Sequence, residues 1–319
     1  MRVSKYLSQW LQWRAPGLAP RTRDCYASTI HKHIDPVIGH RQMHKLQPRH
    51  VAALIDQLVA DGHGRTAQLV YAILHSALRD ASRVTSRDGN VTHHAIVTHN
   101  PVDMVPRPGH ISRHYQHLDQ ADIPRYLDAV AADRLALAWL LALLCGLRRG
   151  EICGLMWPDV DLAAMVLHIH NQRVSVCHAG TIDTAPKSAA GRRDVPIPAA
   201  LLPLLAVAQA PDGYVITNMR GDPYTPSGLD HAHRAMVRRA DLPPISPHGL
   251  RHTMATLAVS SGVHIRVLQS ILGHASYQIT ADTYAHVYAS ASASAVDRVA
   301  QSVLHSSQGL PHGPWAPDS

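Results

Sequence analysis

The chain of 319 residues is 46% hydrophobic and 17% charged, with a net charge of +7 when histidine is counted as neutral. This composition excludes a globally disordered protein, and the length predicts two domains because single cores stop growing at roughly 250–300 residues. The basic balance favours nucleic acid as a partner, ahead of an anionic membrane surface. Four cysteines without metal-ligand spacing indicate free thiols in a reducing cytoplasm, and neither a secretory signal nor a membrane-spanning run is recognisable.

Apolar residues recur at helical spacing in four segments of the first 83 residues. The segments cover about 3–14, a stretch that opens at Ala19-Pro20, 47–61 and 65–82. We expect Pro36 and Gly39 to break the second helix, because proline disrupts helical hydrogen bonding and glycine favours helix ends. Four short helices with brief loops predict a compact all-α domain over residues 1–83.

Basic side chains dominate the polar faces of these helices, where acidic residues are few. We interpret them as phosphate contacts on a DNA duplex, with an ordinary solvated face as the alternative for any single residue. The residues predicted to bind DNA are Arg21, Thr22, Lys32, Arg41 and, in the second half of the chain, Arg192. Arg149 and Arg193 lie beside the motifs described below, and they either contact DNA or are simply solvated.

Helical periodicity lapses between residues 84 and 117, where Asp88-Gly89-Asn90 is followed by several prolines and glycines. We predict that residues 84–117 are a linker between the two domains. At the other end, residues 289–319 are predicted to be a tail. The tail begins as a weakly amphipathic helix that docks on its own domain or on a neighbouring protomer, and it ends in disorder.

The second domain is predicted to span residues 118–288 and to be mainly helical. Asp119 is expected to cap a helix that runs to about Val130, and the apolar run Leu135–Gly146 predicts a buried helix. Further helices are predicted over about 199–208, 227–240, 248–261, 265–272 and from residue 280 onward.

Two extended segments interrupt these helices. Residues 165–176 predict a strand or hairpin, and residues 181–197 predict an extended pair around a Lys187–Gly191 turn. The predicted fold class is therefore mainly α with a small β-sheet. Because neither GxGxxG nor a P-loop motif occurs, no nucleotide-binding fold is indicated.

The last third of the chain combines imidazoles, guanidinium groups and a phenol. They lie in the stretches His248-Gly-Leu-Arg251-His252, Leu272-Gly273-His274 and Thr283-Tyr284, with Arg148 and Lys187 upstream. Attack of a phenol on a phosphodiester needs positive charge at the non-bridging oxygens, a base or positive field at the phenol, and an acid for the leaving alkoxide. Two arginines, two histidines, one lysine and one tyrosine meet these needs, which favours phosphoryl transfer without a metal ion.

In this order and spacing the motifs resemble those of the tyrosine recombinases, the phage-integrase type of site-specific recombinase. The matching stretches are Gly146-Leu-Arg148-Arg-Gly-Glu151, Pro186-Lys187 with Gly191-Arg-Arg-Asp-Val-Pro196, His248-Gly-Leu-Arg251-His252-Thr253, Leu272-Gly273-His274 and Thr283-Tyr284-Ala-His286. The N-terminal part of the chain is similar to the family's core-binding domain at Thr22, Tyr26, His33-Ile-Asp-Pro36 and Asn100-Pro101. The resemblance covers residues 3–290. It implies a four-helix, SAM-like core-binding domain followed by an α+β catalytic domain.

The resemblance implies that Tyr284 attacks the scissile phosphate, forms a 3′-phosphotyrosyl link and frees a 5′-hydroxyl. Lys187 would protonate the leaving 5′-oxygen, and His248 would assist proton transfer from the tyrosine. Tyr277 and Tyr288 are the rival nucleophiles, and a packed structural tyrosine is the alternative for Tyr284.

The same resemblance assigns the phosphate contacts. Arg148 and Arg251 would hold the non-bridging oxygens, and His274 would donate a hydrogen bond to the phosphate. Glu151 follows Arg148 at i+3 and is expected to orient the site rather than react. At Gly249 the family often has aspartate, a departure at a non-reacting position. No metal ion or other cofactor is implied.

The implied function is a site-specific DNA recombinase that integrates or excises a phage or mobile element. Its expected partners are double-stranded DNA at core attachment sites, further copies of the chain (a dimer on one site, a tetramer on two) and a directionality factor, in the cytoplasm and without a membrane. Because the sequence starts at the core-binding helices, we expect no additional arm-site domain. The alternatives are a transposon integrase, a type IB topoisomerase, a non-catalytic DNA-binding regulator, and a metallohydrolase that fits the 25 histidines by number alone.

Overall fold

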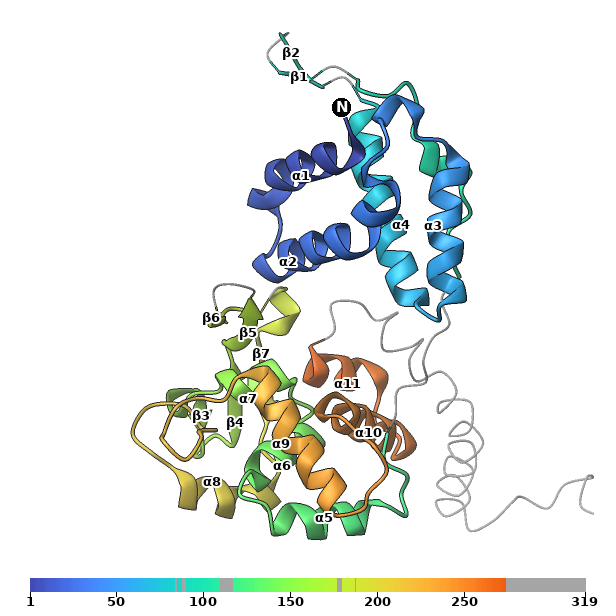
Figure 1. Cartoon of the computed structure of the whole chain (residues 1–319). Coiled ribbons are helices and arrows are strands. Elements are labelled where there is room, and N and C mark those ends of the chain that lie inside the picture. Colours follow the sequence, from blue (N-terminus) through green and yellow to red (C-terminus); the bar gives the residue numbers. More distant parts are fainter. Residues whose placement is uncertain are drawn as a thin grey trace, which may run out of the picture. The chain divides into compact units, whose positions relative to one another are not determined.

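The computed structural model describes residues 1–83, 85–87, 90–93, 95–109, 117–176, 180–186 and 188–273, with the side chains of 85–87 and 90–93 left aside. The described residues form two compact units (Figure 1). We call them the N-terminal unit, up to residue 109, and the C-terminal unit, from residue 117. The predicted tail, residues 289–319, lies outside the described residues.

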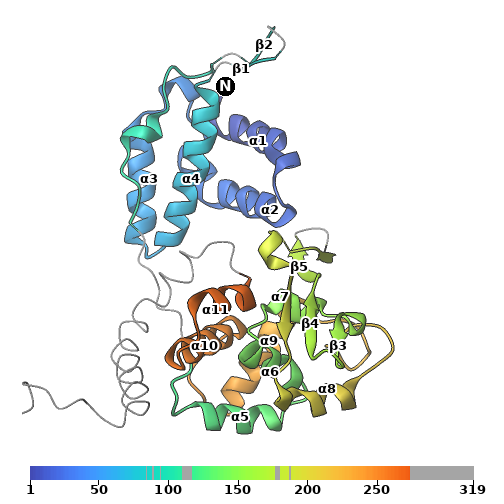
Figure 2. The same cartoon turned by 180° about the vertical axis from the view of Figure 1, so that it is seen from behind.

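The N-terminal unit is a small helical bundle, as the sequence predicts. Its helices are α1 (Val3–Arg14), α2 (Pro20–Thr29), a π-helix (Ile30–Gly39), α3 (Pro48–Ala60) and α4 (Gly64–Ala81), with 3-10 turns at Ala15–Gly17 and Met43–Lys45. Figures 1 and 2 show α4 between α3 on one side and α1 and α2 on the other. Two side chains of α1 fasten it to α4: the Tyr6 hydroxyl donates to the Ala77 carbonyl (2.8 Å), and Trp10 Nε1 donates to Asp80 (2.9 Å).

The predicted break at Pro36 is wrong. The chain continues from α2 through Ile30–Gly39 as a π-helix with Pro36 inside it, and ends only at Gly39. Proline lacks an N–H and clashes with the carbonyl of the preceding turn in an α-helix, so the wider π-turn is the form in which this helix contains it. Gly39 ends the segment in tight quarters, because a Cβ there would lie 3.2 Å from the Ser4 side chain.

Part of the predicted linker packs against the N-terminal unit. Strands β1 (Thr85–Arg87) and β2 (Asn90–His93) pair antiparallel, and a 3-10 turn follows at Pro101–Met104. The buried Asn100 side chain accepts from Val102 N (3.1 Å) and donates to the His75 carbonyl on α4 (3.3 Å). Val102 and Val105 join the core of the unit. The sequence does not reveal this packing, because prolines and glycines interrupt the segment and only isolated apolar residues enter the core.

The C-terminal unit is mainly helical with two small sheets. Its helices are α5 (Ile123–Ala131), α6 (Ala136–Leu144), α7 (Arg149–Gly154), α8 (Leu202–Ala208), α9 (Pro226–Arg239), α10 (Pro247–Ser260) and α11 (Ile265–Leu272). Its strands are β3 (Val160–Asp161), β4 (Val166–Ile169), β5 (Gln172–Val176), β6 (Gly180–Thr184) and β7 (Arg193–Pro196). Figures 1 and 2 show α10 and α11 side by side on one flank and β3 and β4 on the other, with α6 and α9 between them. The buried helix predicted near residues 135–146 is confirmed as α6.

Two expectations for this unit need correction. Helix α5 begins at Ile123, with Pro124 in its first turn, and the carbonyl of Asp119 only accepts from Asp122 N in the turn before it. The segments within residues 181–197 do not pair with each other: β7 pairs with β4 in a sheet ordered β3-β4-β7, whereas β6 pairs with β5. Burial explains the first pairing, because Leu167 of β4 lies opposite Val195 of β7 and both face the core. Within the described residues, no helix is long and apolar enough to span a bilayer.

A buried histidine connects three helices of this unit and makes its stability depend on pH. His233 on α9 shares a hydrogen bond with the Tyr126 hydroxyl on α5 (2.9 Å), and its ring lies 4.7 Å from that of Trp139 on α6. Burial lowers the pKa of His233 to about 4, against smaller opposing effects of the Ile245 backbone and the Asp133 carboxylate.

We therefore expect the C-terminal unit to lose stability as the pH falls from about 6.5 towards 4, because His233 binds a proton in the unfolded chain but not in the folded chain. The loss is up to roughly 3 kcal/mol. Urea unfolding at several pH values gives the free energy of unfolding as a function of pH. This free energy should depend less steeply on pH in His233→Gln than in wild type. His231→Gln, an exposed position on the same helix, should keep the wild-type pH dependence. Equal slopes in both variants would contradict this assignment.

Candidate active site

A buried carboxylate holds two of the arginines of the sequence motifs. Glu151 on α7 is 1% exposed and accepts hydrogen bonds from the Arg148 backbone N–H (2.8 Å) and from Arg148 Nη1 (2.7 Å). Arg193, the first residue of β7, donates to both oxygens of the same carboxylate at 2.9 Å. This paired geometry is the strongest form of ion pair that a guanidinium offers.

The arginines keep Glu151 ionised. Burial raises the pKa of this carboxyl, but the hydrogen bonds and charge of Arg193, together with the charges of Arg148 and Arg251, lower it to about 2. One carboxylate therefore balances part of a cluster of at least three guanidinium groups. The remaining positive charge is what a phosphate diester would meet at this site.

Three arginines from separate elements bind successive carbonyls at the C-terminal end of α11. Arg193 Nε donates to the Ile271 carbonyl (2.5 Å), Arg251 Nη2 on α10 to Leu272 (2.5 Å), and Arg148 Nη2 to Gly273 (2.9 Å). The last carbonyls of a helix lack partners within the helix and carry its negative dipole end, so they attract cations. These bonds hold the C-terminal end of α11 in place up to Gly273.

Arg251 is the most enclosed member of the cluster, with 2% of its surface exposed. Its Nη1 donates to the Gly146 carbonyl (2.5 Å) at the turn before Arg148. Gly146 has φ +63°, and a Cβ there would lie 3.0 Å from Leu272. The turn that carries Arg148, the helix that carries Arg251 and the end of α11 are therefore one packed assembly.

His248 lies in the first turn of α10, where the Ser246 hydroxyl caps the helix by accepting from Gly249 N (3.1 Å). Its ring contacts the His252 ring edge-on, with centroids 4.6 Å apart. Part of the side chain reaches solvent. Even so, the surrounding protein lowers the pKa of His248, and the neighbouring arginines of the cluster lower it further. The imidazole is neutral at pH 7 and able to accept a proton.

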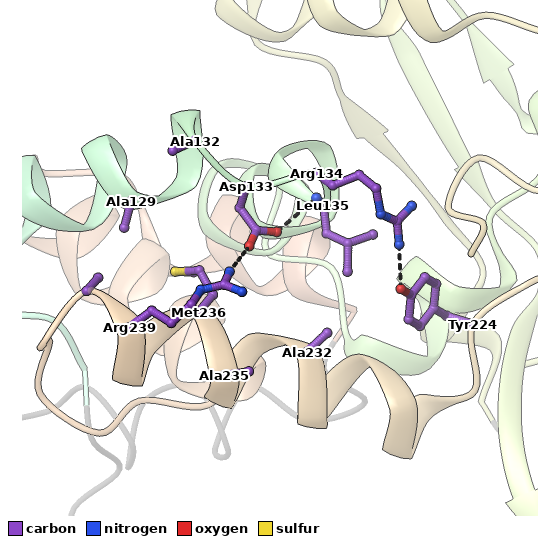
Figure 3. A pocket seen from close by; sticks show the side chains of 11 residues that line it. Ala129, Ala132, Asp133, Arg134, Leu135, Tyr224, Ala232, Ala235, Met236 and Arg239 are labelled. Atoms are coloured by element: carbon purple, nitrogen blue, oxygen red, sulfur yellow. Dashed lines mark hydrogen bonds and ion pairs between the residues drawn. The ribbon is translucent and has the colours of Figure 1, made fainter. Parts of the chain in front are cut away.

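A separate pocket lies between the α5–α6 turn and α9 (Figure 3). Its volume is about 580 Å³. Alanines line much of it, and at its rim Arg239 donates to Asp133 (2.8 Å) while Arg134 donates to the Tyr224 hydroxyl (2.6 Å). The described residues among those predicted to be catalytic, Arg148, His248 and Arg251, do not line this pocket, so the candidate active site is the arginine cluster.

Comparison with known proteins follows this geometry. A model described as "Phage integrase family" matches residues 116–291, and "Phage integrase, N-terminal SAM-like domain" matches residues 3–59. The chain belongs to the phage integrase family.

Relatives within the phage integrase family include recombinases and transposases of mobile elements. A "Tyrosine recombinase XerC-like" protein of Caldanaerobacter subterraneus subsp. tengcongensis is 30% identical over 201 residues, which cover 55% of this chain and 51% of that protein. The "ICEBs1 integrase" of Bacillus subtilis is 23% identical over 278 residues, or 81% of this chain and 72% of that one. The chain thus spans about half the length of the first of these relatives.

Solved structures of the phage integrase family share the fold. The Tn1549 transposon integrase in complex with transposon right end DNA superposes with a TM-score of 0.78 at 18% identity, over 94% of this chain and all of that one. A lambda integrase dimer bound to a COC′ core site gives 0.66 at 19% identity, over 89% of this chain and 95% of that one. The predicted fold class, a core-binding domain followed by a catalytic domain of this family, is confirmed.

The structure brings together three of the six predicted catalytic residues of this phage integrase: Arg148, His248 and Arg251. The other three, Lys187, His274 and Tyr284, lie outside the described residues. Among the predicted DNA-binding residues, Arg21, Lys32 and Arg192 are exposed, whereas Thr22 and Arg41 are half-buried.

The interpretation of Arg193 as a DNA contact or a solvated side chain is wrong, because its side chain is 6% exposed and bound to Glu151. Strand alternation is the signal that reveals it: Arg193 lies two residues before Val195 and four before Ile197, so all three face the core. Arg149 forms an ion pair with Asp230 on α9.

Proposed function

We propose that the protein is a site-specific DNA recombinase that integrates or excises a mobile element through a covalent 3′-phosphotyrosyl intermediate. The observation that carries the proposal is the convergence of Arg148 and Arg251 on the end of α11, with His248 on the same helix as Arg251. A half-exposed guanidinium, a buried one and an uncharged imidazole in one place suit a phosphodiester that gains charge during attack.

Arg148 is placed to contact the phosphate. Its side chain is 33% exposed, and its described hydrogen bonds use one donor each from Nη1 and Nη2. A guanidinium has five N–H donors. Glu151 therefore fixes the partly exposed group, and we propose that its remaining N–H donors bind the non-bridging oxygens of a DNA strand.

In the proposed first step, the Tyr284 oxygen attacks the scissile phosphorus while the bond from phosphorus to the 5′-oxygen breaks. His248 accepts the phenolic proton and Lys187 gives a proton to the leaving 5′-oxygen. His274, next to the fixed Gly273, donates a hydrogen bond to the phosphate. In the second step a 5′-hydroxyl attacks the phosphotyrosine, the tyrosine leaves, and the strand is rejoined. The energy of the phosphodiester is retained in the protein–DNA link, so no ATP is consumed.

We propose double-stranded DNA with core attachment sites as the substrate, bound by a dimer on one site and by a tetramer on two, with the cytoplasm as the place of action. The DNA complexes of the Tn1549 and lambda integrases support the choice of DNA. We keep the proposed catalytic domain at residues 118–288 and the tail at 289–319, and we extend the core-binding domain past residue 83 to include the packed segment that ends near Val105.

The deciding experiment is covalent trapping on nicked duplex DNA in EDTA, with candidate sites taken from the sequence that flanks the gene. We expect wild type, Tyr277→Phe and Tyr288→Phe to form a protease-sensitive adduct, and Tyr284→Phe to form none. An adduct that persists in Tyr284→Phe would remove the proposed nucleophile. Absence of any adduct on DNA that the protein binds would favour a non-catalytic regulator, and relaxation of supercoiled DNA without site preference would favour a topoisomerase.

The DNA-binding role of the N-terminal unit makes a separate prediction. Lys32→Ala should weaken binding by a similar factor on all sequences and reduce the slope of log affinity against log salt by about 1, because one phosphate contact is lost. Lys5→Ala, an exposed lysine on α1 without a predicted contact, should leave the slope unchanged. Salt titrations by fluorescence anisotropy measure both, and an unchanged slope for Lys32→Ala would exclude that residue as a phosphate contact.

A further inference from the structure

Two histidines and an aspartate converge on the exposed face of the β3-β4-β7 sheet. His168 lies on β4 directly opposite Asp194 of β7, and His170 follows two residues later, immediately after the end of the strand. One ligand atom from each of the three side chains lies within 4.8 Å of the others. The arginine cluster of the candidate active site does not include any of them.

We propose that His168, His170 and Asp194 bind a divalent transition-metal ion, with Zn²⁺ as the preferred ion. Imidazole nitrogens and carboxylate oxygens are the ligands that zinc takes beside cysteine, and a site with three protein ligands leaves a position for water. Magnesium and calcium are disfavoured, because they prefer an all-oxygen shell.

The protein holds these ligands on a fixed frame. Leu167 and Ile169, which alternate with the two histidines, are 0% and 1% exposed, and Val195 beside Asp194 is 1% exposed. The rings of His168 and His170 are stacked, with centroids 5.8 Å apart and planes within 12°. One ligand on β4, a second just after the end of β4 and a third on the neighbouring strand β7 therefore present their ligand atoms within 4.8 Å of one another.

A fourth side chain supports the arrangement. The Asp159 carboxylate lies 3.5 Å from His170 Nδ1 and is itself only 22% exposed. Carboxylates commonly accept the second ring N–H of a ligating histidine and so orient the ring. Asp159 would have this role, with the other ring nitrogen of His170 directed to the ion.

The simpler alternative is a surface ion pair. His168 Nδ1 and Asp194 Oδ1 are 2.8 Å apart, so a proton shared between them satisfies both groups without a metal. This pair does not explain why His170 stacks on His168 and brings a third ligand atom into the same small volume. A bound ion would replace this hydrogen bond with bonds from both groups to the metal.

An ion at this position would fasten β4 to β7. The residue before Asp194 is Arg193, whose guanidinium holds Glu151 and the end of α11. Metal binding would therefore stabilise the strand that supports the arginine cluster without touching the reacting groups. The proposal stands or falls independently of the recombinase activity.

The test is Co²⁺ binding to the full-length chain, followed by visible absorption, and Zn²⁺ binding followed by calorimetry. Because other histidines also bind metals, the comparison is between two double variants: His168→Asn with His170→Asn, and the control His231→Asn with His264→Asn, which are exposed residues of the same unit. We expect the first to lose one Co²⁺ site, or to bind at least tenfold more weakly, and to lose the Zn²⁺-induced rise in Tm. The control should behave as wild type.

Equal stoichiometry, affinity and Tm response in both double variants would overturn the proposal. If the first double variant is misfolded by circular dichroism, Asp194→Asn replaces it, since this change is isosteric and Asp194 is 66% exposed. Retention of the Co²⁺ site in well-folded Asp194→Asn would likewise reject the three-ligand assignment.

Discussion

Replacement of Glu151 by glutamine is expected to lower the free energy of unfolding by about 3–5 kcal/mol, the usual cost of breaking a buried ion pair. The carboxylate is 1% exposed and Arg193 is 6% exposed, so the mutation leaves a buried guanidinium facing a neutral amide. Arg148 loses the same partner. Glutamine has nearly the shape of glutamate, so the effect reports the charge rather than a cavity.

The matched control is Asp230→Asn. This change breaks the ion pair between Asp230 on α9 and Arg149, which lies on α7 together with Glu151. That pair is 38% and 22% exposed, so its loss should cost no more than about 1 kcal/mol. Urea unfolding of the full chain at pH 7 compares the two. Similar costs for both variants would show that Glu151 does not anchor the cluster.

The pH dependence of this difference follows from the pKa of Glu151, which is lowered to about 2. A carboxyl with a lowered pKa stabilises the folded state fully above its ordinary value of about 4.5, and the stabilisation is lost as the pH falls towards 2. The gap between wild type and Glu151→Gln should therefore narrow steadily below pH 4.5. A gap that stays constant to pH 3 would mean that the lost stability is not electrostatic.

The same substitution tests the proposed function. Arg148 is held at two points by Glu151, so we expect adduct formation to fall at least tenfold while DNA affinity changes little. The double variant Glu151→Gln with Arg193→Gln should recover part of the stability, because the buried guanidinium that bound both oxygens of Glu151 is gone. It should not recover activity, since Arg148 still lacks its anchor. If activity recovered together with stability, Glu151 would only stabilise the fold and would not be needed to position Arg148.

Most of the elements, but not all of their contacts, can be predicted from the sequence. Apolar periodicity locates α1, α3 and α4, because each buries one face, and a continuous apolar run locates α6, which is buried over most of its length. The pairing of the extended segments cannot be predicted, because any two neighbouring strands show the same alternation of apolar residues. Only packing in the core determines that β7 pairs with β4. The prediction of a helix end is wrong where an unusual helical turn accommodates proline, as at Pro36.

In the candidate site, too, some features can be predicted from the sequence and others cannot. The resemblance to the tyrosine recombinases selects motif residues such as Arg148 and Arg251, and the chemistry of phosphoryl transfer explains why they are guanidinium groups. The binding of three arginines to the carbonyls of Ile271, Leu272 and Gly273 cannot be predicted, because it depends on where α11 ends in space. Sequence motifs therefore suggest which groups react, and tertiary structure decides which charged residues contact Arg148 and Arg251.

Gly273→Ala is expected to be the most damaging substitution of a single hydrogen by a methyl group in the C-terminal unit. Gly273 ends α11 at φ +62°, a left-handed conformation that costs other residues roughly 1–2 kcal/mol. A Cβ there would lie 2.6 Å from the Ala190 carbonyl oxygen and 2.9 Å from Arg193 Cδ. Neither can move freely, because one is backbone and the other belongs to the side chain that binds Glu151.

Gly221→Ala separates the two costs. Gly221 has φ +83° with open space around it, so alanine there should cost only the conformational strain of roughly 1–2 kcal/mol. Gly273→Ala should add a packing penalty of about 1–3 kcal/mol and should shift the carbonyl that accepts from Arg148. Adduct formation should therefore fall strongly in Gly273→Ala and remain near wild type in Gly221→Ala. Equal losses of stability and activity in the two variants would show that the end of α11 has room to adjust, and that the arginine cluster does not depend on its position.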